Sequence, residues 1–410
     1  SFQDMLNEYL PNSLLREELI KRDYILTNIK KDNKWKGGKI IVPFKANGAS
    51  SVRVGGLTAA NDIAESRYIR GSIDSYKEIW GSMIFNHTDL LQHDGKIKES
   101  TFLRVLPDTI EDFMEYMKMV ISVQIGTGPE FAVATATGTA LGVVAVDRID
   151  RFCLDQKCTI ISDLVAALSV YVVGIDLNAG TVTVSASRGG APVDVSAYLL
   201  ADNTRFYHDG VLTAADTFTS LKSALLPAAN GGSATLHGQT KLNYPFLQSI
   251  AIDGSSITAS NIIEQIFDAY AQMRIKARGK VEEILMSYKN LASCMKFVEL
   301  QKGSFKVSAD SQKGSQYGWD MIEVMEVGSG RKIKFVGIQE MSDSEIFFID
   351  WKALTFRTNG FIRKRTAPDG KQYYETRTTA GFAYILDSFL FGELEVKKPS
   401  CCGIIYGISY

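Results

Sequence analysis

The sequence predicts a mixed α+β fold in which strands outnumber helices. Strand-like runs bounded by glycines fill residues 35–100 and most of the last third of the chain, whereas two long stretches, near 108–125 and 258–279, carry apolar residues at helical spacing. The chain has 410 residues, 45% of them hydrophobic, which is enough to bury a sizeable core and to form two or three structural lobes. No internal repeat is detectable.

Residues 1–34 mix leucine and isoleucine with charges at roughly helical spacing, interrupted by Pro11, and predict a short helix within an extended arm. From Trp35 to about Ser100 the pattern becomes strand-like and predicts a long hairpin that leads into a sheet. Its strands are expected at Lys39–Pro43, Val52–Val54 and Tyr76–Phe85. Because a two-stranded hairpin is marginally stable in water, we expect it to pack on something else.

A long helix is expected to open at Pro107 and Asp108 and to stop at Gly126. Asp108 and Glu111 form a capping pair for it. One apolar stripe consists of Ile110, Phe113, Met114, Met117 and Ile121.

Successive short strands are expected over roughly 150–210, with a hairpin turn inside Ile175–Val184, and they indicate a small β-barrel or β-rich inserted lobe. Thr258 is expected to cap a second long helix that Gly279 closes. A strand at Val281–Met286 and a helix near Tyr288–Leu300 follow. The last strands are predicted at Met321–Val327, Lys332–Gly337, Ile346–Ile349 and Leu354–Phe356, with a hairpin turn at Pro368–Gly370.

The charge balance argues against a specific reader of nucleic acid. Lys plus Arg number 45 against 46 Asp plus Glu, so the net charge of -1 gives no overall attraction to phosphates or anionic membranes. A container for nucleic acid tolerates this neutrality, because DNA driven in by a motor need not be held by counterion-releasing contacts. Without ~18 continuous apolar residues or a signal pattern, we expect a soluble, unexported protein.

The motifs of common enzymes are missing from the sequence. It contains no G-x-x-x-x-G-K-[ST], G-x-S-x-G or H-E-x-x-H. Gly328–Lys332 comes nearest to an anion-binding loop, and a β-turn between flanking strands explains its glycines more simply. We therefore expect no enzyme, assign no catalytic, cofactor-binding or metal-binding residue, and expect no cofactor.

The histidines and cysteines favour structural roles. His87, His93, His208 and His237 are scattered and are expected at the surface or in turns. Cys153 and Cys158 are expected as buried thiols rather than metal ligands. Cys401 and Cys402 lie in an apolar tail, where packing is favoured over an inter-subunit bond. The odd total of five cysteines fits synthesis in a reducing cytoplasm.

The basic cluster Arg363–Arg365 is expected on a solvated hairpin face, with an inter-subunit salt bridge as the alternative.

The order of these elements resembles the major capsid proteins of tailed bacteriophages with the Hong Kong 97-type fold. Trp35–Pro43 looks like the entry to that family's extended loop, Lys77–Gly81 like its return strand, and Ile110–Ile125 like its spine helix. Leu236–Thr240 with Tyr244–Phe246 and Ile284–Ser287 are similar to stretches of its axial domain. Tyr317–Gly318, Lys332–Val336, Ile346–Asp350 and Leu354–Phe356 look like its peripheral sheet.

The resemblance implies a division into six segments. These are an N-terminal arm (1–34), an extended β-hairpin loop (35–75), a peripheral domain (76–149) with the spine helix at 108–125, a β-rich inserted lobe (150–210), an axial domain (211–320) and a return to the peripheral and axial sheet (321–410). The β-rich insert is not part of the family's minimal fold.

The resemblance also implies a function. We expect a structural subunit that assembles as hexamers and pentamers into an icosahedral capsid around double-stranded DNA. Its expected partners are other copies of itself, portal, scaffold and decoration proteins, and packaged DNA without sequence-specific contact; no membrane is expected. The protein would be made in the bacterial cytoplasm and reside in the virion. The alternatives are an encapsulin-like nanocompartment shell and, from another class, an α+β hydrolase or ligand-binding protein.

Overall fold

The computed structural model describes residues 23–33, 35, 38–45, 68–86, 101–135, 142–162, 167–195, 204–211, 216–277, 280–300, 321–325, 332–359, 363–366, 373–378 and 381–410. These residues form two compact units, and each unit combines segments far apart in the sequence. Unit 1 takes its described residues from Lys77–Leu221 and Ile362–Phe389, and unit 2 from Asp23–Tyr76, Lys222–Phe361 and Leu390–Tyr410.

A six-stranded mixed sheet forms the core of unit 2. In sheet order its strands are β13 (Ile250–Asp253), β22 (Gly403–Tyr406), β17 (Glu345–Ile349), β14 (Glu283–Met286), β16 (Lys332–Gly337) and β15 (Met321–Met325). All residues of β14 and β17 are buried. Such continuous burial is typical of central strands that are covered on both faces.

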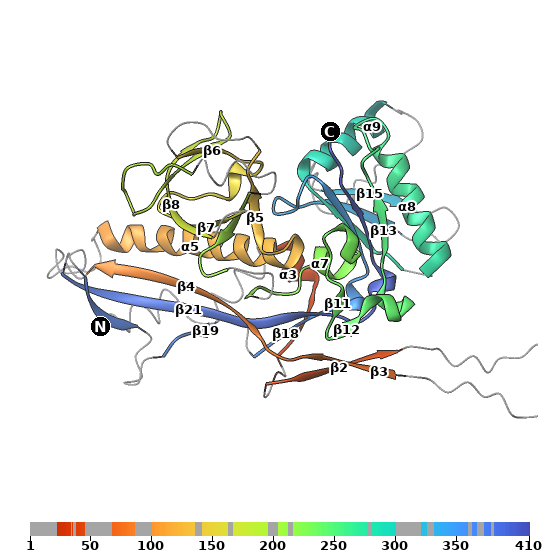
Figure 1. Cartoon of the computed structure of the whole chain (residues 1–410), viewed down its shortest axis with the longest axis horizontal. Helices are drawn as coiled ribbons and strands as arrows, with labels where there is room; N and C mark the ends of the chain where they lie inside the picture. The colour runs from red at the N-terminus through yellow and green to blue at the C-terminus, as the bar shows by residue number, and fades with distance from the viewer. Residues whose placement is uncertain are drawn as a thin grey trace, which may run out of the picture. The chain divides into compact units, whose positions relative to one another are not determined.

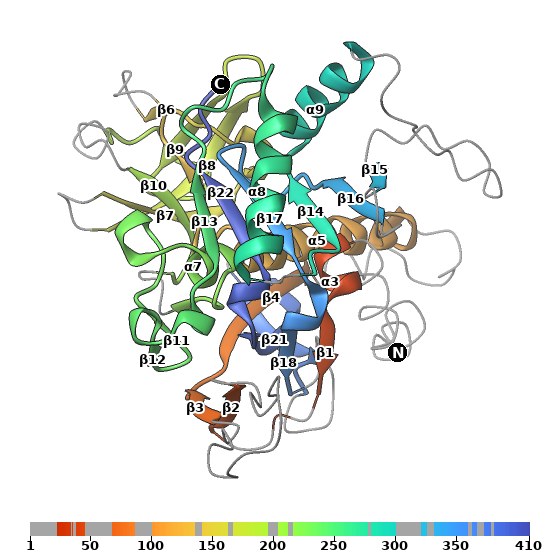
Figure 2. The same ribbon diagram turned by 90° about the vertical axis from the view of Figure 1, so that its right-hand side faces the viewer.

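Helix α8 (Ile262–Ala277) packs one apolar stripe against this sheet, and α9 (Tyr288–Leu300) follows β14 (Figure 2). Ile262, Ile266 and Met273 are buried on that stripe, at the spacing of a helix face. The expected start at Thr258 is wrong. Thr258 lies in a turn that is closed by its N–H bonding to Asn261 Oδ1 at 2.7 Å, and the helix begins only after this turn.

Three further segments of unit 2 form a second sheet region. β1 (Lys30–Asp32) pairs in parallel with β18 (Leu354–Thr358), which pairs antiparallel with the last five residues of β21 (Gly381–Val396). Before β1 lies the short helix α3 (Tyr24–Asn28), whose Ile25 and Leu26 are buried. Residues 23–32 therefore belong to the core of unit 2. The rest of the expected arm, residues 1–22, lies outside the described residues.

Two small hairpins complete unit 2. β2 (Ile40–Lys45) and β3 (Tyr68–Ile73) pair antiparallel from Ile40↔Ile73 to Lys45↔Tyr68 (Figure 1). β11 (Thr235–Leu236) and β12 (Gln239–Thr240) pair across a two-residue turn. The expected strand at 52–54 lies outside the described residues.

Unit 1 contains a 26-residue helix, α5 (Thr101–Gly126), which packs along β4 (Lys77–Asn86). A Cβ at Gly81 of β4 would lie 2.6 Å from the Phe113 ring and 2.7 Å from Met117 Sδ, so any larger residue would displace these side chains. The expected helix start at Asp108 is wrong. Pro107 lies inside the helix, where it removes one backbone hydrogen bond without ending so long an element.

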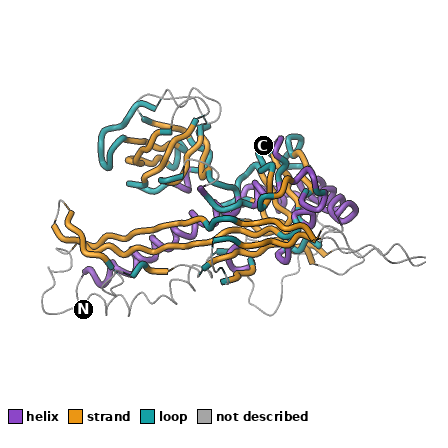
Figure 3. Tube along the Cα trace, turned by 60° about the horizontal axis from the view of Figure 1, so that its bottom comes forward, coloured by secondary structure: helices purple, strands orange, loops and turns teal. Residues whose placement is uncertain are grey.

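The other strands of this region pair with β21. β20 (Tyr374–Thr378) pairs with Gly381–Ile385 and β19 (Arg363–Lys364) with Ser388–Phe389, and β4 pairs with β21 as well. β21 is thus the shared strand of the sheet, and the tube view shows its long course beside β4 (Figure 3).

A six-stranded antiparallel barrel forms the rest of unit 1. Its strands are, in order, β5 (Glu130–Val133), β10 (Arg205–His208), β7 (Lys157–Ile161), β8 (Leu168–Asp176), β9 (Thr181–Ser185) and β6 (Val143–Ala145). The first and last strands close the ring, because Thr135 N–H donates to Ala145 O at 2.9 Å and Asp147 N–H to Val133 O at 3.0 Å. Two of the strands precede residue 150, where the insert was expected to begin.

The barrel has a solid apolar core. Buried and less buried side chains alternate along β6 and the first half of β8, whereas β7 and β10 each have three consecutive buried residues. The core includes Phe131, Val144, Ile160, Val170, Val172, Val182, Val184 and Phe206. The β8–β9 turn has the expected hairpin chemistry, since Asp176 Oδ1 accepts from the N–H groups of Asn178 and Ala179, and Gly180 takes a positive φ of 64°.

Candidate functional site

The turn between β11 and β12 holds the root of the β2–β3 hairpin. Its two residues, His237 and Gly238, both have positive φ, 47° and 77°. These values fit a tight turn of the I′ type, for which asparagine–glycine is the favoured pair. A non-glycine residue in this left-handed conformation is uncommon, although histidine is one of the residues found there more often than most.

Two hydrogen bonds join this turn to the outer edge of β3. Ser72 N–H donates to His237 O at 2.8 Å, and Gln239 Nε2 donates to Arg70 O at 2.9 Å. A two-stranded hairpin leaves such edge groups open to any other strand. The β11–β12 turn therefore caps the edge of β3 at the hairpin's root.

The inner face of the hairpin packs on the same turn. Val42 and Phe44 of β2 are fully buried, and the Phe44 ring stacks on the His237 ring with centroids 6.1 Å apart. Opposite them, a Cβ at Gly71 would lie 2.5 Å from Phe44 Cε2 and 3.0 Å from His237 O. Glycine at this position lets the strand, the ring and the turn come together.

The other side of the His237 ring is bonded to β21. Its Nε2 accepts a hydrogen bond of 3.0 Å from Val396 N–H, which only a neutral imidazole can do at that atom. Burial lowers the pKa of His237 to about 4, so the ring is neutral at physiological pH. The proton of the neutral ring is then on Nδ1.

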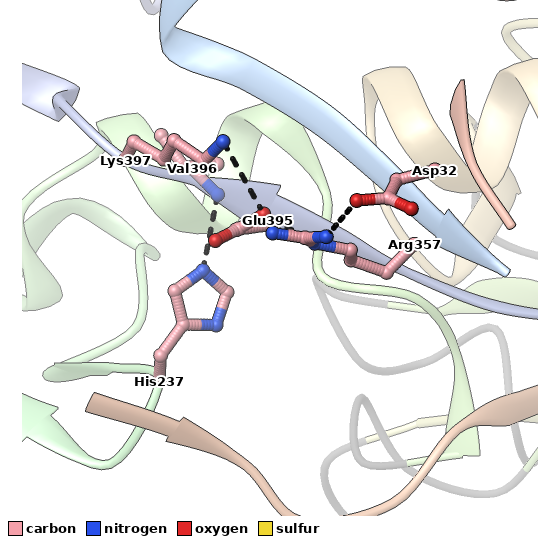
Figure 4. A network of polar contacts seen from close by, with 6 residues as sticks. All are labelled: Asp32, His237, Arg357, Glu395, Val396 and Lys397. Carbon is pink, nitrogen blue, oxygen red and sulfur yellow. Dashed lines mark hydrogen bonds and ion pairs between the residues drawn. The ribbon is translucent and has the colours of Figure 1, made fainter. Parts of the chain in front are cut away.

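A partly buried ion network lies beside this bond (Figure 4). Arg357 of β18 contacts Asp32 of β1 and donates from Nε to Glu395 Oε2 of β21 at 2.6 Å, while Lys397 Nζ lies 3.8 Å from the same carboxylate. The Glu395 side chain is fully buried. Burial lowers the pKa of Arg357, but the bonds and attraction to Glu395 and Asp32 outweigh it and raise the pKa overall. The network links three adjacent strands.

The outer face of the hairpin, in contrast, is exposed. Ile41 is 58% exposed and Tyr68 is 62% exposed, on the opposite face from Val42 and Phe44. The hairpin thus has a buried root and a mixed outer face on which the apolar side chains of Ile41 and Tyr68 are exposed.

The structure buries both histidines that it describes, so the expected surface or turn position is wrong for His208, which lies in strand β10, and holds for His237 only as a turn. His208 lies in the barrel, stacked on Phe131 with centroids 4.5 Å apart, and burial lowers its pKa to about 4. His237 is in a turn as expected, but it is buried there. His87 and His93 lie outside the described residues.

The expectation of buried thiols is confirmed for Cys158 and wrong for Cys153, which is exposed because it lies in the loop before β7. Cys402 is buried and Cys401 half-buried, and all five thiols are free in the structure. Among the described residues, no group of three His, Cys, Asp or Glu side chains is placed to hold a metal ion. No helix in the described segments is long and apolar enough to cross a membrane.

The basic cluster is split between two environments. Lys364 is buried, and burial lowers its pKa to about 8, which corrects the expectation of a wholly solvated face. Arg365 is exposed, with its guanidinium 4.9 Å from the Tyr374 ring centroid and 5.9 Å from that of Trp80. The turns expected at Gly328–Lys332 and Pro368–Gly370 involve residues that the structure does not describe, although β15 and β16 pair antiparallel as the first of them requires.

No protein-family model matches the sequence, and no curated protein matches it. The chain is similar in structure to subunits of capsids. The structural alignment with a chain from the Cyanophage A-1(L) capsid asymmetric unit covers 100% of this chain and 93% of that one, with 11% sequence identity and a TM-score of 0.44. The alignment with the capsid of a native GTA particle covers 94% of this chain and 90% of that one, with 10% sequence identity and a TM-score of 0.46. The alignment with the capsid of Myoviridae Phage XM1 covers 94% of this chain and 91% of that one, with 9% sequence identity and a TM-score of 0.40.

Sequence reasoning missed the residues that anchor the hairpin. His237–Gly238 between two short polar runs is itself a turn signal, but nothing in the sequence says that its ring reaches Val396, 159 residues away. Arg357 and Asp32 are likewise 325 residues apart. Such pairs become visible only once the strand order of the sheet is known.

Proposed function

We propose that this chain is a structural subunit that assembles as hexamers and pentamers into an icosahedral capsid around double-stranded phage DNA. The observation that carries the proposal is the β2–β3 hairpin, whose root is buried in unit 2 while Ile41 and Tyr68 on its outer face stay exposed. A hairpin of this kind is useful when a second copy covers it.

The packing within each unit supports a shell subunit. The long helix α5 packed along β4, and the sheet of unit 2 covered by α8, give two rigid bodies with solid cores. A subunit that occupies several non-identical positions in a shell needs such rigid bodies together with an extension that engages its neighbours.

The energy of each contact is small. Burying one side chain such as Ile41 completely contributes about 1.5–3 kcal/mol before ordering costs are subtracted. Contacts of this size leave a single pair of subunits weakly associated, and they become decisive when each subunit makes them repeatedly around a closed shell. The net charge of -1 also suits a wall around DNA that is not held by specific contacts.

The proposal is tested by assembly of the purified chain and of two matched variants. Ile41→Lys places a charge on the outer face of the hairpin. Leu177→Lys places the same charge at a 72% exposed position of the barrel turn. Negative-stain microscopy and sedimentation velocity should show closed shells for the wild type and for Leu177→Lys, and folded unassembled subunits for Ile41→Lys.

Persistent monomers of the wild type at all concentrations and salt conditions would contradict the proposal. Shells from infected or expressing cells that enclose a cargo protein and no DNA would instead identify the encapsulin-like alternative.

A further inference from the structure

We propose that the His237–Gly238 turn anchors the root of the β2–β3 hairpin and so sets the hairpin's direction, with His237 as the positioning residue. This inference rests on the proposed function, because the hairpin's direction then decides where the next copy is met. The anchoring itself is a local property of unit 2, and it can be measured on the unassembled subunit.

One residue makes contact with three separate segments of the chain. The His237 carbonyl accepts from Ser72 of β3, its ring stacks on Phe44 of β2, and its Nε2 accepts from Val396 at the end of β21. β21 also belongs to the sheet that Arg357 and Glu395 tie together. The hairpin's root is therefore joined to β21 through one residue, which uses both its backbone carbonyl and its ring.

The contacts of the His237 ring set this histidine apart from the other residues that suit its place in the turn. Asparagine at this position would give the favoured residue pair for the turn, and glycine would remove the strain of a positive φ. Either residue would lose both the stack on Phe44 and the bond to Val396. Histidine is a less favoured residue for this turn than asparagine or glycine, but its ring contacts both Phe44 and Val396.

The β11–β12 hairpin also anchors the edge of strand β3. Gln239, on the strand after the turn, donates to Arg70 two residues before Ser72, so two successive edge groups of β3 are satisfied by one small hairpin. An edge held in this way cannot slip or rotate without breaking both bonds.

The test uses His237→Asn with His208→Asn as its matched control. Both histidines are buried, and burial lowers the pKa of each to about 4, but only His237 contacts the hairpin. Asparagine suits the turn, so the β11–β12 hairpin should still form in His237→Asn. The readouts are hydrogen exchange of the full-length chain, peptide by peptide, and the diameter distribution of its shells.

For His237→Asn we expect exchange at Ser72 and Val396 to be at least about tenfold faster than in the wild type, and shells of mixed diameter. For His208→Asn we expect faster exchange in the barrel strands and an unchanged hairpin. A third variant, His237→Phe, keeps a ring against Phe44 but removes the acceptor, and should loosen Val396 more than β2.

Amide hydrogen-exchange rates in the β2–β3 hairpin of His237→Asn that stay within twofold of the wild type would overturn the inference. An equal change of these rates in His208→Asn would overturn it as well. If the wild type forms no shells at all, the proposed function fails, and the exchange comparison still decides whether His237 holds the hairpin.

Discussion

Arg357 Nε donates a hydrogen bond of 2.6 Å to Glu395 Oε2 within the sheet of unit 2, where the Glu395 side chain is fully buried. The same guanidinium contacts Asp32, so β18 is joined through one side chain to both of its neighbours, β1 and β21. A buried carboxylate is tolerated only while its partner stays in place. The last residues of the N-terminal region are thereby tied to the sheet that also holds His237.

Replacing this carboxylate should be costly. Glu395→Gln removes the fully buried carboxylate, while Arg357 keeps its contact with Asp32, and should lower the free energy of unfolding by about 1.5–3 kcal/mol. The control is Glu282→Gln, since Glu282 pairs with Lys352 at 3.0 Å in an exposed position and should change stability by less than about 1 kcal/mol. Urea unfolding of both variants measures the difference; equal midpoints would show that the buried pair has no special role.

A methyl group at the hairpin's root should disturb its packing. Gly71→Ala would place a Cβ 2.5 Å from Phe44 Cε2 and 3.0 Å from His237 O, and overpacking of this kind costs about 1–3 kcal/mol. Gly38→Ala, in the segment leading to the same hairpin, meets nothing within 4 Å and should be neutral. Thermal unfolding and hydrogen exchange of β3 compare the two; the account of the root fails if Gly71→Ala behaves like Gly38→Ala.

The two buried histidines predict a loss of stability in mild acid. The pKa of each is about 4 in the folded protein, against about 6.5 in an unfolded chain. Between these values the unfolded chain binds protons that the folded chain does not, so stability falls as pH drops from about 6.5 to 4, on the order of 3 kcal/mol for each histidine. Above pH 6.5 they contribute no pH dependence.

Unfolding free energies of wild type, His208→Asn and His237→Asn between pH 7 and 4 check this prediction. Each variant should show a shallower slope, by up to one proton, than the wild type. Parallel slopes would mean that these histidines titrate normally in the folded protein.

The N-terminal region should separate into two parts by deletion. Removing residues 1–22 leaves α3 and β1 intact, and we expect a folded subunit that assembles poorly because it lacks the apolar stripe of the arm. Removing residues 1–32 also deletes Ile25, Leu26 and Ile29, which are buried, and should cost about 5 kcal/mol or more. Circular dichroism and sedimentation distinguish the two effects. Normal shells from the shorter deletion would show that residues 1–22 are not needed for assembly.

Local patterns predicted the elements whose signals are local. Helix α9 at Tyr288–Leu300 and strand β16 at Lys332–Gly337 have the expected bounds, because apolar spacing and flanking turn residues determine both. The start of α5 was misplaced, since a proline inside a long helix can be tolerated when the rest of the helix packs well.

Long-range features could not be predicted in the same way. Arg357, Glu395 and Asp32 come together because β1, β18 and β21 are neighbours, and strand order follows from the whole fold rather than from any window of sequence. The burial of His208 and His237 has the same origin, because each ring fills a place that distant residues create. A lone histidine in a sequence carries no sign of this.

Cryo-electron microscopy of the purified wild-type protein, with sedimentation over a range of concentrations, tests the central claim most directly. Our account predicts closed icosahedral shells built of pentamers and hexamers, in which the outer face of the β2–β3 hairpin, with Ile41 and Tyr68, lies against a neighbouring copy. A protein that stays monomeric at every concentration, or shells in which this face remains open to solvent, would contradict it.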